Sequence, residues 1–315
     1  MNQNKIQTII QLGDLFDRRK YVNFLTLSES KRYFFDHIEN KGIKFISLLG
    51  NHDIFWKESL SVNSPDLLLE NYNYIDIIKT PTTINLDGVR IDIIPWICKE
   101  NEEAVFNFVK QSTSNICMGH FELSGFDMMK GIPSQSGIDS NFLFKYDAVY
   151  SGHYHTASTR KNISYLGTPY ELTWADFNDP KGFYILDTDT KETQFIKNEF
   201  LMFKKIYYND IESEVVVNYE DCSEKFVKVI VVNKTDFQKF DAFLDNLYRN
   251  NPAEVKIIED LSEFESSTMN DNINLEDTMT LLSEYVDGVE TDADKERLKT
   301  LLKALYVEAH DYEET

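Results

Sequence analysis

Residues 43–53, IKFISLLGNHD, decide the fold of this chain. The first half is a short apolar run rich in Ile, Leu and Phe, which predicts an interior strand of a largely parallel sheet rather than a helix. The run breaks at Gly50, and Asn51, His52 and Asp53 follow at once. Because open α/β sheets bind ligands at the carboxyl ends of their strands, these three side chains are candidates for a functional site.

The same pattern of an apolar strand, a glycine and then a polar residue occurs three more times, at Gly13, Gly119 and Gly152. Glycine permits the sharp turn and close backbone approach that a bulkier residue would resist. The residues that follow can bind metal, and they are Asp14, His120, His153 and, two positions later, His155. With Asn51 they offer carboxylate, amide and imidazole ligands, a mixture suited to Mn²⁺, Fe²⁺ or Zn²⁺ rather than Ca²⁺. We expect all five to share one sheet edge.

The order of elements predicts the domain organisation. Strands alternate with helices for about 160 residues, which predicts a layered α/β domain. We expect one of these helices over residues 28–40 and a hairpin around Asp87-Gly88. We assign this domain to residues 1–200 and a small α+β cap domain, built on a βαβ unit, to residues 201–260.

The last part of the chain has a different composition. Residues 259–277 carry seven acids and no Lys or Arg, which is typical of a linker, and we place the linker at residues 261–275. A helix pair is predicted over residues 276–315. The second helix carries leucines at i, i+3, i+4 and i+7, namely Leu298, Leu301, Leu302 and Leu305. This stripe either covers the chain's own core or docks a partner, and its position behind a polar linker favours a partner.

Net charge, cysteine spacing and the lack of targeting patterns each argue against particular classes of protein. A formal net charge of -21 counts against a free-standing nucleic-acid binder, although divalent cations or a basic partner could offset the field locally. Cys98, Cys117 and Cys222 are widely spaced and form no CxxC, so neither a disulfide framework nor a zinc knuckle is indicated. No secretory signal pattern and no apolar run of membrane-spanning length occurs in the sequence. A soluble cytosolic protein with no membrane partner is therefore expected.

The motifs GDLFD, GNHD, GH and GHYH, in this order and each closing a strand, resemble those of the calcineurin-like metallophosphoesterases. More narrowly, the chain resembles the nuclease subunits of the SbcCD and Mre-Rad repair complexes, and most of all those of T-even bacteriophages. The resemblance runs nearly end to end, through GDLFDRR at 13–19, LLGNHD at 48–53, IDIIPW at 91–96, GHFELSGF at 119–126, SGHYHT at 151–156 and the segment 165–183.

This resemblance implies a metallophosphoesterase sandwich with two metal sites. Mn²⁺ is the expected cofactor, with Mg²⁺ as an alternative. Asp14 would bridge the two ions, and Asn51, His120 and His153 would complete one site. His155 would contribute to the other. Two cations about 3.5 to 4 Å apart can clamp a phosphate and neutralise the charge that develops on it.

The resemblance also implies a catalytic pair outside the metal ligands. His52 would protonate the leaving 3′ oxygen as a general acid, and Asp53 would orient or charge it. One departure from the family concerns the first metal site. The family begins with a strand that ends in Asp-x-His, whereas residues 1–13 contain no Asp and no His. One of the two metal sites is therefore expected to be incomplete.

The predicted function is that of a metal-dependent DNA exo/endonuclease subunit in DNA end processing, recombination and repair. It would act with an SbcC-like ABC-type ATPase as a homodimer within a two-plus-two complex, and the helices of residues 276–315 would grip the ATPase. Two alternatives stay open: another calcineurin-like phosphatase, and a catalytically impaired structural subunit. The cap, linker and helix pair favour the nuclease over a simple phosphatase, while the absent Asp-x-His favours the impaired subunit. If the protein is phage-encoded, it would work in the host cytoplasm.

Overall fold

The computed structural model describes residues 6–129, 132–134, 136–211, 217–258, 286 and 294–302. The chain forms two compact units, which we describe separately. The first unit is built on Met1–Pro169 and Gly182–Ile196, and the second on Tyr170–Lys181 and the chain from Lys197 onward.

The first unit contains a sheet of three parallel strands in the order β1-β2-β5. Its strands are β1 (Thr8–Gln11), β2 (Lys44–Leu48) and β5 (Ile75–Ile78). The interior strand predicted before Gly50 is therefore confirmed as β2, which lies in the centre of this sheet.

A second sheet of six strands has the order β12-β13-β11-β8-β7-β6. Its inner strands run parallel, while β6 and β12 pair antiparallel with their neighbours. The predicted hairpin joins β6 to β7, and Asp87 and Gly88 both have the positive φ that a tight hairpin turn needs. The strands are β6 (Thr82–Leu86), β7 (Val89–Ile94), β8 (Ile116–His120), β11 (Ala148–Gly152), β12 (Ser158–Arg160) and β13 (Ile163–Tyr165).

The two sheets pack face to face between layers of helices. Leu48 of β2 belongs to a buried cluster with Ile91 and Met118 of the second sheet. Phe45, on the opposite face of β2, packs instead with the helices that precede and follow this strand. On the far face of the second sheet, Cys117 packs with Val105 of the helix α4 (Glu102–Gln111). Both faces of each sheet are therefore buried, which explains the continuous apolar strands and confirms the predicted layered sandwich.

The helices of the first unit are α1 (Phe24–Ser30), the π-helical turn η1 (Lys31–Phe35), α2 (Asp36–Lys41), α3 (Ser64–Leu69), the 3₁₀ turn η2 (Ser140–Leu143) and α4 (Glu102–Gln111). The helix predicted over residues 28–40 is longer, because α1, η1 and α2 follow one another without a break. It begins early because the Asn23 side chain accepts hydrogen bonds from the N–H groups of Leu25 and Thr26. Gly42, with φ 61°, ends it.

Three short antiparallel pairs complete the first unit. They are β3 (Ile54–Trp56) with β4 (Ser59–Asn63), β9 (Asp127–Met129) with β10 (Ile132–Pro133), and β14 (Gly182–Leu186) with β15 (Thr193–Lys197).

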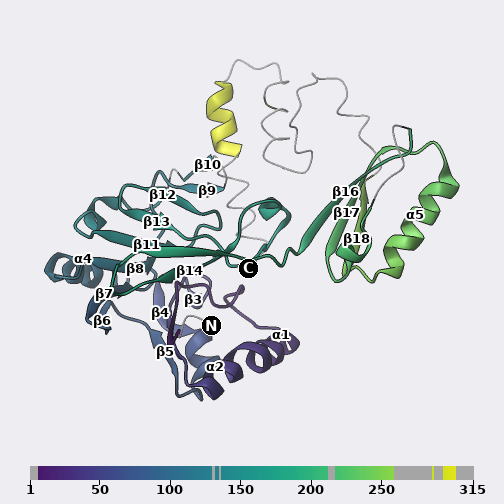
Figure 1. The fold of residues 1–315 in the computed structure, drawn as a ribbon. Helices are drawn as coiled ribbons and strands as arrows, with labels where there is room; N and C mark the ends of the chain where they lie inside the picture. Colours follow the sequence, from purple (N-terminus) through teal and green to yellow (C-terminus); the bar gives the residue numbers. More distant parts are fainter. Residues whose placement is uncertain are drawn as a thin grey trace. The chain divides into compact units, whose positions relative to one another are not determined.

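The second unit contains the predicted βαβ element. Three parallel strands have the order β16-β17-β18, and α5 (Phe237–Arg249) lies alongside this sheet (Figure 1). Phe240, Phe243 and Leu247 of α5 pack with alternate residues of the sheet. The strands are β16 (Phe203–Asn209), β17 (Phe226–Asn233) and β18 (Glu254–Ile258), with the short turns η3 (Trp174–Asp176) and η4 (Glu220–Cys222).

The acidic linker predicted at 261–275 lies outside the described residues, as does most of the predicted helix pair. Residues 295–302 are helical, and Asp294 caps their first turn by accepting the N–H groups of Glu296 and Arg297. On this helix Leu301 is exposed, Leu298 and Leu302 are half-buried, and Leu305 lies beyond the described part of the chain. Across the described ranges, no helix has both the length and the apolar character needed to cross a membrane.

The buried Asp92 carboxylate is a structural centre of the second sheet, and its removal should destabilise the fold. It accepts hydrogen bonds of 2.7 Å from the hydroxyls of Thr83, Ser114 and Tyr146. Asp92→Ala should lower the free energy of unfolding by about 2–4 kcal/mol, because three donors lose their acceptor. Urea denaturation measures this. The matched control is Asp76→Ala, which removes an exposed ion pair with Lys44 and should cost at most about 1 kcal/mol. Equal losses in the two variants would contradict the assignment.

Candidate metal centre

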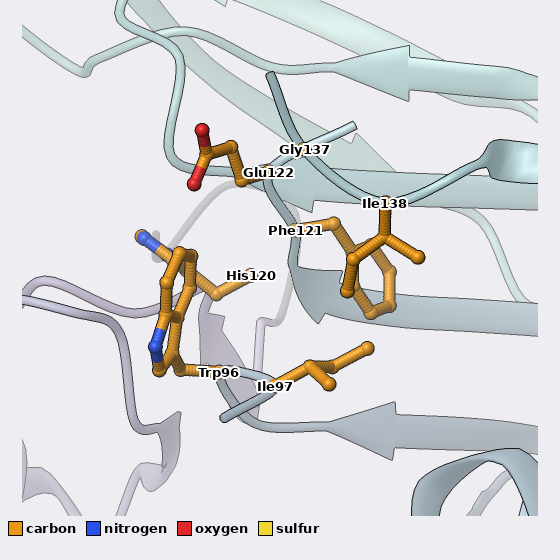
Figure 2. Close-up of a pocket in the computed structure, with 7 residues that line it drawn as sticks. All are labelled: Trp96, Ile97, His120, Phe121, Glu122, Gly137 and Ile138. Atoms are coloured by element: carbon orange, nitrogen blue, oxygen red, sulfur yellow. The ribbon is translucent and has the colours of Figure 1, made fainter. Parts of the chain in front are cut away.

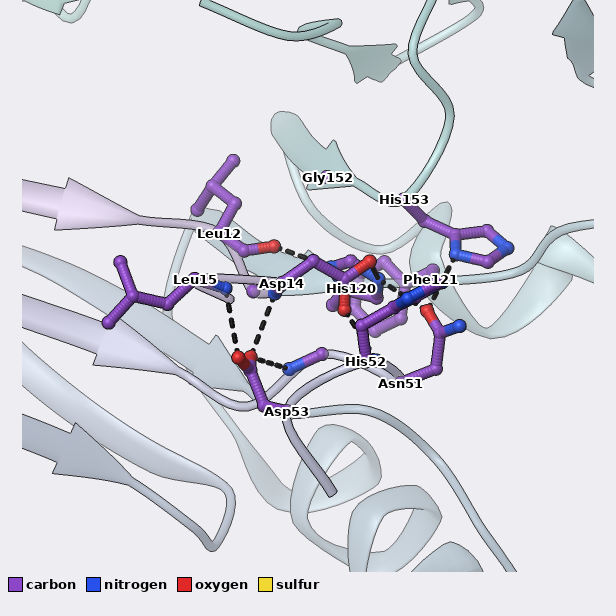
Figure 3. A network of polar contacts seen from close by, with 12 residues as sticks. Leu12, Asp14, Leu15, Asn51, His52, Asp53, His120, Phe121, Gly152 and His153 are labelled. Carbon is purple, nitrogen blue, oxygen red and sulfur yellow. Dashed lines mark hydrogen bonds and ion pairs between the residues drawn. The ribbon is translucent and has the colours of Figure 1, made fainter. Parts of the chain in front are cut away.

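The structure gathers most of the predicted metal ligands at one place, but they do not share one sheet edge as expected. Asp14 and Asn51 follow β1 and β2 of the first sheet, whereas His120 ends β8 and His153 follows β11 of the second sheet. The expectation was wrong because the strands divide between two packed sheets. Their carboxyl ends meet, so that the ligand atoms of Asp14, His120 and His153 lie within 4.8 Å of one another (Figure 3).

Hydrogen bonds fix how these side chains face one another. His120 Nδ1 lies 2.7 Å from the carbonyl oxygen of Leu12, so this nitrogen carries the proton and donates it. His120 Nε2 lies 3.1 Å from Asp14 Oδ2 and 2.9 Å from Asn51 Oδ1. The same Asn51 oxygen lies 3.0 Å from Nδ1 of His153. A carboxylate oxygen, an amide oxygen and two imidazole nitrogens therefore converge.

This donor set fits a divalent transition-metal ion. The bond from His120 Nδ1 to Leu12 leaves Nε2 of the neutral ring as the ligand atom, which is the usual way in which a backbone carbonyl fixes a metal-binding histidine. Burial and the neighbouring His120 lower the pKa of His153 to about 3, so its imidazole is neutral near pH 7. Mixed oxygen and nitrogen ligands suit Mn²⁺, Fe²⁺ or Zn²⁺.

The charges of the cluster are mutually supporting. Burial opposes ionisation of Asp14, but the charge and hydrogen bond of His120 hold the pKa of Asp14 below its ordinary value. Burial likewise opposes the charged form of His120, and the Asp14 carboxylate nevertheless raises the pKa of His120. In the absence of a cation the pair thus keeps a proton, which an incoming divalent ion would displace.

The backbone at the cluster is strained. Asp14 and His153 have φ values of 56° and 87°, in the left-handed region that non-glycine residues rarely occupy. Gly13 and Gly152 precede these two residues, and neither position has room for a side chain. A Cβ on Gly13 would lie 2.3 Å from His120 Nδ1, and one on Gly152 would lie 2.3 Å from the carbonyl oxygen of Leu12.

His155 is the predicted ligand that does not join this cluster. Its side chain is exposed, and the cluster found within the described residues contains Asp14, His120 and His153 without it. The role of His155 in a second metal site stays a prediction.

Asp53 has a different position from the predicted one. Its side chain is fully buried, and its carboxylate accepts four backbone N–H groups (Figure 3). Oδ2 accepts from Gly50 and Asp14 at 2.8 Å, while Oδ1 accepts from Leu15 at 2.9 Å and Phe16 at 3.3 Å. Burial and the charge of Asp14 raise the pKa of Asp53 to about 7. Through these contacts Asp53 holds the loop after β1 and the turn after β2 together.

A backbone contact from Asp17 helps to orient His52. His52 is half-buried, and its Nδ1 lies 2.6 Å from the backbone carbonyl oxygen of Asp17. The backbone N–H of His52 in turn donates to Asp14 Oδ1 at 2.8 Å. The GDLFD motif was recognised in the sequence, but its last residue, Asp17, was not predicted to belong to the site. Its position three residues after Asp14 could have indicated this role.

Trp96 is a second residue that sequence reasoning missed. Its ring centroid lies 5.9 Å from that of His120 and 5.4 Å from that of His153. With His120 and Glu122 it lines a small cavity of about 70 Å³ beside the cluster, and Figure 2 shows its ring alongside His120. The available signal was again its position, because Trp96 follows the strand β7 at the same end as the predicted ligands follow theirs.

Comparison with known proteins identifies the family of this chain. The sequence profile described as calcineurin-like phosphoesterase matches residues 1–157, which include the whole cluster. The chain belongs to the calcineurin-like phosphoesterase family, whose members bind divalent metal ions. Over 310 residues it is 34% identical to "Exonuclease subunit 1" of Enterobacteria phage T4, covering 98% of this chain and 89% of that protein. A solved archaeal phosphodiesterase aligns with 62% of this chain and 86% of its own, at 16% identity and a TM-score of 0.32.

Asp53→Asn should loosen the cluster while every predicted metal-ligating side chain is kept. The amide keeps one acceptor oxygen but turns its NH₂ group toward two backbone donors. We expect a loss of about 2–4 kcal/mol in the free energy of unfolding. Mn²⁺ affinity should fall about 10- to 100-fold, as measured by titration calorimetry. The control is Asp17→Asn, because the Asp17 side chain is 76% exposed and only its backbone contacts His52. An unchanged Mn²⁺ affinity in Asp53→Asn would contradict the role of Asp53 in holding the two ligand-bearing loops together.

Proposed function

We propose that this chain is the nuclease subunit of a DNA-processing complex and hydrolyses phosphodiester bonds of DNA as a Mn²⁺-dependent exo/endonuclease, in DNA end processing, recombination and repair. The observation that carries the proposal is the joint placement of Asp14, Asn51, His120 and His153 with His52 beside them. The similarity to a phage exonuclease subunit over nearly the whole chain supports the choice of DNA among phosphate esters.

In this proposal the cluster would bind a divalent cation, and His52 would transfer a proton. A divalent cation held by the cluster would supply positive charge against the charge that develops on the phosphate. Asp14 is held in position by the N–H of His52, so the predicted acid and the predicted ligand move together. Because His52 Nδ1 donates to the Asp17 carbonyl, Nε2 is the atom that exchanges a proton with substrate. In its protonated form His52 would transfer that proton to the leaving 3′ oxygen.

A local basic segment supports a phosphate substrate despite the net charge of -21. Arg18, Arg19 and Lys20 follow directly after Asp17, whose carbonyl contacts His52. Arg19 Nη1 is buried, and in the described part of the chain it has no hydrogen-bond partner. A guanidinium in this state is suited to a phosphate oxygen.

The direct test of the proposal compares two substrates. With Mn²⁺ the full chain should cut a DNA duplex, and chelation should abolish the cleavage. Hydrolysis of bis(p-nitrophenyl) phosphate without DNA cleavage would favour another phosphatase of the family. Bound Mn²⁺ without hydrolysis of either substrate would favour the second candidate, a catalytically impaired structural subunit. That candidate is motivated by the sequence, because residues 1–13 contain no Asp and no His and so lack the family's Asp-x-His.

His52→Ala should separate catalysis from metal binding. As a general acid His52 contributes to turnover, so the variant should keep its Mn²⁺ affinity while single-turnover DNA cleavage falls by about 10² to 10⁴. His37→Ala, at an exposed histidine of α2, is the matched control and should change neither quantity. Loss of Mn²⁺ from His52→Ala would show that His52 is a ligand.

We further propose that residues 276–315 bind an SbcC-like ABC-type ATPase in a two-plus-two complex with a homodimer of this chain. The described helix of residues 295–302 leaves Leu301 55% exposed. An exposed leucine in line with Leu298 and Leu302 suits recognition of a helix in an apolar groove. The relative in phage T4 is by its name a subunit, which supports a multisubunit assembly.

Charge placed on the leucine stripe should break this complex. Leu301→Glu should reduce capture of the ATPase in a pull-down at least about tenfold, because a charge would be buried in an apolar contact. Thr300→Glu carries the same charge on the opposite side of the helix and should leave capture intact. Deletion of residues 276–315 should abolish capture while the metal centre still binds Mn²⁺. Undiminished capture by the deleted chain would show that the helices cover the chain's own core.

A further inference from the structure

Trp96 connects the two sheets at the metal centre through its backbone. Its N–H donates to the carbonyl oxygen of Leu49 at 2.7 Å, and Leu49 directly precedes the Gly50-Asn51 turn. On its other side, the Trp96 carbonyl accepts a 2.9 Å hydrogen bond from Nδ2 of Asn101. Trp96 follows β7 of the second sheet, so these bonds fix a residue of one sheet against the ligand loop of the other.

The Trp96 ring meets both imidazoles of the cluster. Its centroid is 5.9 Å from that of His120, with an angle of 67° between the ring planes, and 5.4 Å from that of His153, with an angle of 44°. The two histidine rings are themselves 5.1 Å apart. All three distances lie in the range of favourable aromatic pairs. Among the described residues, Trp96 is the aromatic side chain that contacts both rings, whereas Tyr154 contacts His153.

Polar bonds at ring atoms leave the tilt of the two histidine rings to other contacts. His153 bonds to Asn51 through Nδ1. His120 bonds to Leu12 through Nδ1, while its Nε2 contacts Asp14 and Asn51, the residues that would share the ion with it. Once Nε2 is given to an ion, the bond at Nδ1 still permits the ring to tilt. His153 also stands on a strained backbone with φ 87°. Metal binding requires ligand atoms held within about 0.5 Å by the groups around them.

We propose that Trp96 is a positioning residue of the metal centre, whose ring fixes the tilt of His120 and His153 so that both present a nitrogen to the same ion. The proposal concerns metal binding and not the DNA substrate. Its tests therefore use Mn²⁺ alone, and a failure of the proposed nuclease function would not affect them.

Two substitutions in the full-length chain distinguish the effect of the aromatic ring of Trp96 on Mn²⁺ binding from the effect of its volume. Trp96→Phe keeps an aromatic face and should hold the Mn²⁺ dissociation constant within about threefold of the wild type. Trp96→Leu keeps an apolar side chain without a ring and should weaken Mn²⁺ binding about 10- to 100-fold, the usual range for groups that support metal ligands. Thermal unfolding of both variants is measured in parallel. Equal Mn²⁺ affinity in the two variants at similar stability would overturn the proposal.

Fluorescence gives a second measurement that does not need Trp96 to be replaced. The chain has three tryptophans, so Trp56→Phe/Trp174→Phe leaves Trp96 as the single emitter. Trp56 is 59% exposed, Trp174 packs against Phe177 and Phe203, and neither belongs to the metal-ligand cluster. Titration with paramagnetic Mn²⁺ should quench Trp96 with the midpoint of metal binding, and adding Asp14→Ala should remove the effect. Unchanged emission at saturating Mn²⁺, or equal quenching with Asp14→Ala, would overturn the contact on which the proposal rests.

Discussion

The four hydrogen bonds that the Asp53 carboxylate accepts are the interaction on which the metal centre depends. A carboxylate has about four acceptor positions, so one side chain can collect N–H groups from the loop after β1 and the turn after β2. Bonds of this charge-assisted kind contribute roughly 1.5–3 kcal/mol each. That is enough to offset the roughly 1–3 kcal/mol that left-handed backbone costs at Asp14.

In the metal centre, the oxygen-bearing and the nitrogen-bearing side chains come from different sheets of the sandwich. The predicted oxygen ligands Asp14 and Asn51 come from the first sheet, and the predicted nitrogen ligands His120 and His153 come from the second. An ion bound there would therefore join the two sheets, so that metal binding and the stability of the sandwich are coupled. The Trp96 backbone crosses the same junction by bonding to Leu49. The hydrogen bond from Trp96 to Leu49 and an ion at the metal centre would thus both hold the two sheets together at the same place.

The strongly acidic composition and a phosphate substrate are compatible because charge acts locally at such a site. Arg18, Arg19 and Lys20 follow directly after Asp17, whose carbonyl contacts His52, while most of the 53 acidic residues lie elsewhere in the chain. Bound divalent ions add the largest local positive charge. The net charge of -21 still opposes long-range attraction of any polyanion.

The sequence by itself determined the local features. Apolar strands ended by glycine, the Asp87-Gly88 hairpin and the βαβ element of the second unit could be predicted because each is set by residues close together in the chain. The same reasoning named the four residues that the structure brings together, since each lies at or shortly after the end of a strand. Only the tertiary structure decided which sheet each strand joins, that Asp53 brackets a loop 37 to 39 residues away, and that Trp96 lies against two histidines. These depend on hydrogen bonds and ring contacts between distant segments, for which periodicity and spacing carry no signal.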